Sequence, residues 1–71
     1  MKITGTVVYQ DFEGGFWGII ADNNRQYEPV GELPRAVQVT NGRIEAVIEP
    51  ADVLSMKMWG QPVYVRSIKR L

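Results

Sequence analysis

Short alternating segments separated by turn residues are the feature that most restricts the folds open to this chain. The segment Lys2–Gln10, "KITGTVVYQ", is rich in β-branched residues and alternates with a period of two, which predicts a half-buried strand. The segment Phe16–Ala21, "FWGIIA", predicts a second strand that has no clearly polar face. Gly14 and Gly15 precede it, and because glycine adopts positive φ freely, they are suited to the turn between the two strands.

Three further strands are predicted downstream. Arg25–Val30 is a short third strand, and Asn23-Asn24 before it suits a two-residue hairpin turn because asparagine tolerates the left-handed region. Arg43–Glu49 alternates again, and Pro50 is expected to end it. Val63–Arg70 is the last predicted strand.

The last strand needs an irregularity to bury its apolar residues. Val63 and Val65 share one face, whereas Ile68 falls on the opposite face. A β-bulge near Arg66-Ser67 would return Ile68 to the core, because a bulge inserts one extra residue into a strand.

The connections between strands are less regular. Gly31–Val37 predicts a single helical or 3₁₀ turn. Ala51–Pro62 is ambiguous: Met56 and Met58 have strand spacing, but Gly60 and Pro62 favour a loop.

Together these elements predict one all-β domain over residues 1–71, a small five-stranded Greek-key barrel of the OB type. An SH3-like barrel is the alternative. Closing the sheet removes exposed edges, which a chain of 71 residues with a thin core could hardly protect otherwise.

The chain has no cysteine and no histidine, so it lacks thiolate ligands, disulfides and the commonest general base. We therefore expect no enzyme, no cofactor and no metal. Asp11 and Glu13 are two residues apart, and Asp22 or Glu28 could approach them across the hairpin, but solvated turn acids are the preferred interpretation. The glycines of "EGGFWG" lie between two strands rather than before a helix, which excludes a dinucleotide-binding loop.

The net charge is zero but unevenly distributed. Residues 1–52 contain four basic and eight acidic side chains, whereas residues 53–71 contain four basic and none acidic. The basic end could form an interaction edge, or acidic neighbours in the fold could cancel its field; we favour cancellation. Neither a signal peptide nor a run of about 20 apolar residues is visible, so a cytoplasmic protein without membrane contact is expected.

The first two predicted strands resemble those of cold-shock domains, which bind single-stranded nucleic acid. Gly5, Thr6 and Val7 match the start of that family's first strand, and Phe16 can match one of its stacking aromatics. Gly18 stands where the next stacking aromatic is expected. The resemblance therefore implies a shared barrel hairpin more than shared binding.

Over its whole length the chain resembles small uncharacterised prokaryotic OB-fold-like proteins. The resemblance is carried by "EGGFWGI", by Tyr27-Glu28-Pro29, by Leu33-Pro34 and by Met58-Trp59-Gly60. It implies a fold and no activity.

Two kinds of binding remain open. The preferred function is a protein-interaction module of unknown ligand, whose partner could be a second copy of the chain in a homodimer. The alternative is weak binding of single-stranded nucleic acid. It is not preferred because phosphate contacts need a positive surface. The candidate surface combines side chains favoured at binding sites: Trp17, Tyr27, Met58, Trp59, Tyr64 and Arg66. Trp59 could instead plug the end of the barrel, and whether Phe16 or Trp17 faces the interior is left open.

Overall fold

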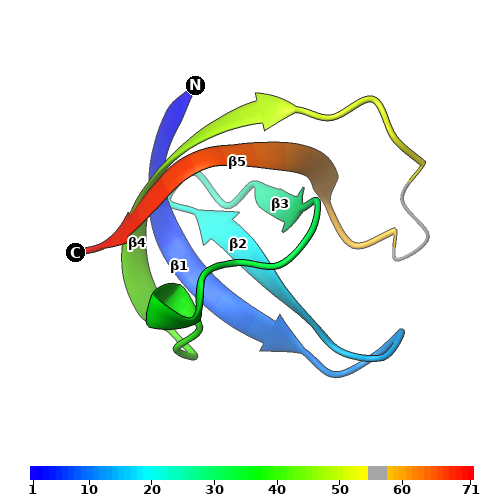
Figure 1. The fold of residues 1–71 in the computed structure, drawn as a ribbon, viewed down its shortest axis with the longest axis horizontal. Helices are drawn as coiled ribbons and strands as arrows, with labels where there is room; N and C mark the ends of the chain where they lie inside the picture. Colours follow the sequence, from blue (N-terminus) through cyan, green and yellow to red (C-terminus); the bar gives the residue numbers. More distant parts are fainter. Residues whose placement is uncertain (55–57) are drawn as a thin grey trace.

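Residues 1–54 and 58–71, described by a computed structural model, form five strands and one short helix. The elements are β1 (Lys2–Gln10), β2 (Phe16–Ala21), β3 (Gln26–Pro29), the 3₁₀ helix η1 (Arg35–Val37), β4 (Gly42–Pro50) and β5 (Gln61–Arg70). The strands close into a barrel in the order β1-β2-β3-β5-β4 (Figure 1). The predicted all-β class and the small five-stranded barrel are confirmed.

Strand order follows from one long return of the chain. The first three strands are antiparallel neighbours, and β4 then comes back to pair with β1. This is the order of a Greek key. β5 closes the barrel, antiparallel to β4 and parallel to β3.

The core is a continuous layer of aliphatic side chains inside the barrel. The side chains with the lowest exposure come from β1, β2, β4 and β5: Val7, Ile19, Ile44, Ile48 and Val63. Burial of each such side chain stabilises the fold by about 1.5–3 kcal/mol. Leu33 and Val37, from the connection between β3 and β4, are also buried in this core, so η1 covers part of the barrel.

The predicted bulge in the last strand is present. Val47 pairs with Ser67 and Ile48 pairs with Val65, so Arg66 has no residue opposite it in the β4–β5 register. Ile68 consequently packs against the core, as Val65 does. The extra residue thus allows the apolar residues on both sides of it to point into the barrel.

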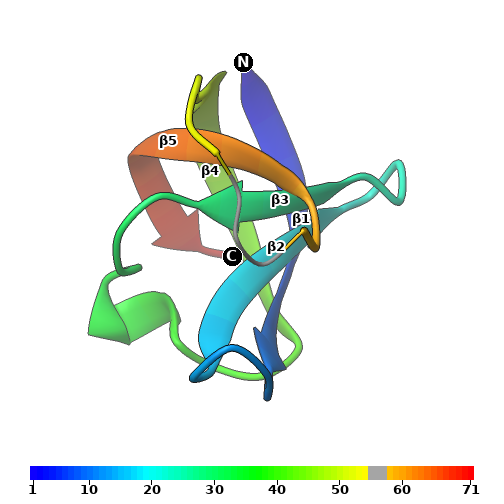
Figure 2. The same ribbon diagram turned by 90° about the vertical axis from the view of Figure 1, so that its right-hand side faces the viewer.

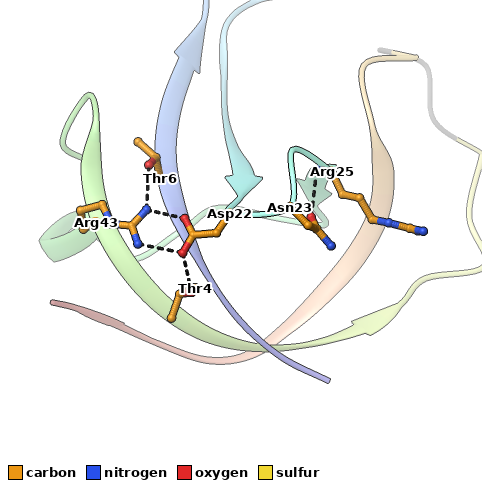
Figure 3. Close-up of polar contacts among 6 residues, drawn as sticks. All are labelled: Thr4, Thr6, Asp22, Asn23, Arg25 and Arg43. Carbon is orange, nitrogen blue, oxygen red and sulfur yellow. Dashed lines mark hydrogen bonds and ion pairs between the residues drawn. The ribbon is translucent and has the colours of Figure 1, made fainter.

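The turn between β2 and β3 has three residues rather than the predicted two. The amide of Ala21 donates to the carbonyl of Arg25 (2.9 Å), and Asn24 has a φ of 71°. The side-chain oxygen of Asn23 accepts a hydrogen bond from the Arg25 amide (3.0 Å; Figure 3). This Asx-type contact spans two residues and therefore favours the longer loop.

The bounds of β3, β4 and β5 also differ from the prediction by one or two residues. β5 begins at Gln61 and includes Pro62, because the parallel pairing with β3 brings Glu28 opposite Pro62. The carbonyl of Pro62 accepts a hydrogen bond from Ala51 (2.9 Å). β4 extends to Pro50, which is paired with Val63.

Candidate functional site

β2 places its two adjacent aromatic side chains on opposite faces. Trp17 lies on the same face as Ile19 and packs against the core, where it is partly buried. Phe16 and Gly18 therefore face the outside of the barrel. The ring of Trp17 makes an edge contact with Tyr9, the residue opposite it on β1, at a centroid distance of 5.1 Å.

Trp59 packs on the outer face of β2. A Cβ atom at Gly18 would lie 2.5 Å from the Trp59 ring, so only glycine leaves room for the indole. Trp59 also makes an edge contact with Phe16, at 5.7 Å between ring centroids. Its side chain is half-buried, so Trp59 neither fills the barrel interior nor stands free as a contact surface.

A buried carboxylate holds the chain at this position. Glu28 is 5% exposed, and its Oε1 accepts hydrogen bonds from the backbone amides of Trp59 (2.5 Å) and Gly60 (2.7 Å). Hydrogen bonds to an ionised acceptor are stronger than neutral ones. The expectation that Glu28 is a solvated turn acid is wrong: it ties β3 to the end of the β4–β5 loop.

A groove of about 600 Å³ opens beside these residues. Its walls come from the β1–β2 hairpin, from residues 28–33 after the middle of β3, and from the β4–β5 loop with Val53 and Leu54. Figure 1 shows the β1–β2 loop and residues 51–54 after β4 on the same side of the barrel, at the right of the view, and Figure 2 looks onto that side. A volume of this size is typical of a ligand site.

The lining of the groove is apolar and acidic. Its apolar side chains come from all three walls: Tyr9, Phe16, Trp17, Val30, Leu33, Val53 and Leu54. Glu13, Glu28 and Glu32 are its charged residues, and within the described chain no lysine or arginine lines it. The groove therefore presents negative charge around an apolar floor.

Large apolar side chains are exposed at the rim of the groove. Leu54 is 86% exposed, and Met58, which is 88% exposed, lies in the same loop. Tyr9, which lines the groove, is 46% exposed. Phe12, in the β1–β2 turn, is 40% exposed and makes an edge contact with the groove residue Phe16 (5.2 Å). Such a concentration of exposed apolar side chains is typical of an interaction site.

The other predicted surface residues lie elsewhere. Tyr27 is 5% exposed and belongs to the core. It pairs with Ile19 of β2, so both side chains point into the barrel. Tyr27 is therefore not available for binding at the surface. Tyr64 and Arg66 are exposed on β5 and do not line the groove. The guanidinium of Arg66 lies 5.4 Å from the Tyr64 ring centroid and donates a hydrogen bond to Glu49 (2.9 Å).

Sequence reasoning missed much of this site. Glu13, Glu32, Val53 and Leu54 were not among the candidates, although two adjacent apolar residues in a segment expected to be mostly loop were a usable signal. The prediction that Met56 has strand spacing lies outside the described residues.

The basic C-terminal strand has acidic neighbours. Lys69 lies 3.4 Å from Glu45 and Arg66 lies 2.9 Å from Glu49, both on β4. A hydrogen bond from Lys2 lowers the pKa of Glu45, with a smaller contribution from Lys69, and a hydrogen bond from Arg66 lowers that of Glu49. Acidic neighbours thus offset part of the charge of β5, as preferred from the sequence.

A second polar cluster joins β1, β4 and the turn after β2 on the barrel surface (Figure 3). Arg43 of β4 donates two hydrogen bonds to the Asp22 carboxylate, at 2.6 and 2.9 Å. Thr4 of β1 donates to the same carboxylate (2.8 Å), and Arg43 also donates to Thr6 (3.3 Å). The hydrogen bonds from Arg43 and Thr4 lower the pKa of Asp22 to about 2.

Within residues 1–54 and 58–71, no group of three or more acidic side chains is arranged to hold a metal ion. The same residues contain no helix with the length and apolar character needed to cross a membrane. No protein-family model matches the chain, and searches of curated proteins and of solved structures found no match either. The groove and its surroundings are therefore the basis for any functional argument.

Proposed function

We propose that this protein is a non-catalytic interaction module that binds a segment of a partner protein in the groove between the β1–β2 and β4–β5 loops. The observation that carries the proposal is the combination of an apolar lining, three glutamates and exposed apolar side chains at the rim. Apolar anchors in a pocket supply most of the binding energy of protein interfaces. The negative charge favours a partner segment that carries basic residues.

We further infer that the barrel is of the OB type rather than SH3-like. The return of β4 beside β1 and the closure by β5 support this inference, because the OB fold is a five-stranded Greek-key barrel. OB barrels bind ligands at the β2–β3 face and at the loops after β1 and β4. The groove lies in the corresponding place, and the resemblance to small prokaryotic OB-fold-like proteins agrees with this inference.

A second candidate is binding of single-stranded nucleic acid, as the partial resemblance to cold-shock domains implies. One observation favours it: Tyr9, Phe12, Phe16 and Trp17 supply aromatic rings in the hairpin beside the groove. Each stacked base is worth about 1–3 kcal/mol. The lining is acidic, however, and phosphates need cations, so the protein ligand is the preferred one.

Selection from a random displayed peptide library tests the proposal. The full chain is expected to enrich peptides that bind with a Kd of about 1–100 μM, a range typical of short-peptide recognition at about 5–8 kcal/mol. Leu54→Glu should abolish binding because it adds a charge to an apolar wall. Leu71→Glu is the matched control, since Leu71 is also exposed (63%) but does not line the groove. Failure to enrich any peptide, or equal loss in both variants, would contradict the proposal.

Titration with single-stranded oligonucleotide at low salt tests the second candidate. The protein-binding proposal expects no change in tryptophan fluorescence at tens of micromolar oligonucleotide. Quenching that fades as salt is added, which is the signature of phosphate contacts, would favour nucleic acid instead.

A further inference from the structure

The ladder between β2 and β3 does not reach the N-terminal part of β2. Ile19 pairs with Tyr27 and Ile20 pairs with Gln26, but no pairing continues toward Trp17 and Phe16. Continuing the same register would place Pro29 opposite Trp17, and proline has no amide hydrogen to donate to a ladder. β2 and the residues after β3 diverge here, and both line the groove.

The direction of the backbone groups follows from the turn. The amide of Ala21 donates to Arg25 on the β3 side, so in an antiparallel ladder the odd-numbered residues of β2 turn their backbone polar groups toward β3. Trp17 is therefore the next residue to do so, and its amide and carbonyl are directed to the groove. The β2–β3 ladder uses neither group.

We infer that the partner segment binds as an added, extended strand along β2 beside Trp17, with alternate side chains against the apolar lining and a lysine or arginine toward Glu32 and Glu13. The inference rests on the proposed function and names its ligand class: an extended peptide with apolar residues and a basic one. Strand addition supplies affinity through main-chain hydrogen bonds and specificity through pockets for alternate side chains.

The charges around the groove indicate where the basic residue of the peptide lies. The Glu28 carboxylate already accepts two backbone amides, so it is committed to the β4–β5 loop. Glu13 and Glu32 are exposed, and neither forms an ion pair with a described residue. Both line the groove, on opposite walls, and are placed to meet a cation on a bound peptide.

The test is a backbone N-methyl scan of a peptide selected on the full chain, with each Kd measured by calorimetry. N-methylation removes a donor without changing the side chain. Because the Trp17 carbonyl is the acceptor, strand addition predicts that methylation at one peptide residue weakens binding about tenfold, the equivalent of one hydrogen bond of about 1.4 kcal/mol, whereas methylation of the residues on either side of it has little effect.

The charge is tested in the same assay. Glu32→Lys should weaken binding several-fold, and exchanging the basic residue of the peptide for glutamate should restore it. Glu49→Lys, on β4 and outside the groove, is the matched control. A selected peptide that binds as a helix, tolerates methylation at every residue or lacks a basic residue overturns this inference and leaves the interaction module intact. Failure to select any peptide whose binding is lost in Leu54→Glu overturns both the strand-addition inference and the proposed interaction module.

Discussion

At the scale of single residues, Glu28 and Gly18 together fix the position of Trp59. Glu28 holds the backbone of Trp59 and Gly60 with two hydrogen bonds, and Gly18 leaves the space that the indole fills. The β4–β5 loop, which supplies one wall of the groove, is therefore tied to β3 and β2 at its C-terminal end. The shape of the groove depends on this attachment.

Removal of the Glu28 carboxylate should release the loop. Glu28→Ala leaves two amides without their acceptor, and we expect a loss of about 1–3 kcal/mol in the free energy of unfolding, measured by urea denaturation. Glu28→Gln keeps one acceptor oxygen and should lose less. The Trp59 indole N–H signal should shift in both variants, and an unchanged signal together with unchanged stability would contradict the attachment.

Gly18→Ala should displace Trp59 by direct contact. The added methyl would lie 2.5 Å from the ring, and overpacking of this kind typically costs about 1–3 kcal/mol. The Trp59 indole signal is expected to shift with the stability. Gly14→Ala is the control: nothing lies within 4 Å of its Cβ, so its cost comes from a φ of 83° and the Trp59 signal should stay in place.

At the scale of elements, the cluster of Asp22, Arg43, Thr4 and Thr6 links the end of β2 to β1 and β4. All four side chains lie at the barrel surface, so the cluster adds little through charge alone. Its contribution is geometric, because the two hydrogen bonds from Arg43 fix the orientation of the Asp22 carboxylate.

Stability should depend on pH through Asp22. Its pKa in the folded protein is about 2, below the ordinary value of 3.8, so its contribution is fully present above about pH 4 and is lost as the pH falls toward 2. Asp22→Asn should therefore be less stable than wild type in urea denaturation at neutral pH, with a difference that shrinks between pH 4 and 2. Asp11→Asn serves as the control, and a difference independent of pH would contradict this role.

The elements themselves were largely predictable. Alternation of apolar residues located β1 and β4, and turn residues beside β2 and β3 located those two strands. In β5 the misplaced Ile68 revealed the bulge at Arg66, because a regular strand has a period of two. The three-residue β2–β3 turn was not predictable in the same way, since it depends on a side-chain contact from Asn23. The inclusion of Pro62 in β5 was not predictable either, because it depends on the parallel pairing with β3.

At the scale of the whole molecule, the closed barrel collects loops that are far apart in the sequence into one groove. Trp17 was predictable as a candidate because tryptophan is favoured at binding sites, and the β4–β5 loop was predictable because apolar residues in loops are unusual. The buried role of Glu28 and the core position of Tyr27 were not, since both depend on which strands become neighbours. The acidic character of the groove follows from the same closure, which brings Glu13 beside residues 28–33.

The charge pattern separates two sides of the protein. The basic residues of β5 face acidic residues of β4, whereas Glu13 and Glu32 at the groove form no ion pair with a described residue. A basic peptide is therefore expected to approach the groove, and its binding should weaken as salt is added, because the attraction is screened.

The most direct test of the account is an amide chemical-shift titration of the labelled protein with a selected peptide, with a single-stranded oligonucleotide in a parallel titration. The account predicts that the peptide shifts the amides of Gly15, Trp17, Val30 and Leu54, that those of Tyr64 and Arg66 remain in place, and that the oligonucleotide shifts none of them. Peptide-induced shifts confined to β5, or groove shifts with the oligonucleotide alone, would contradict it.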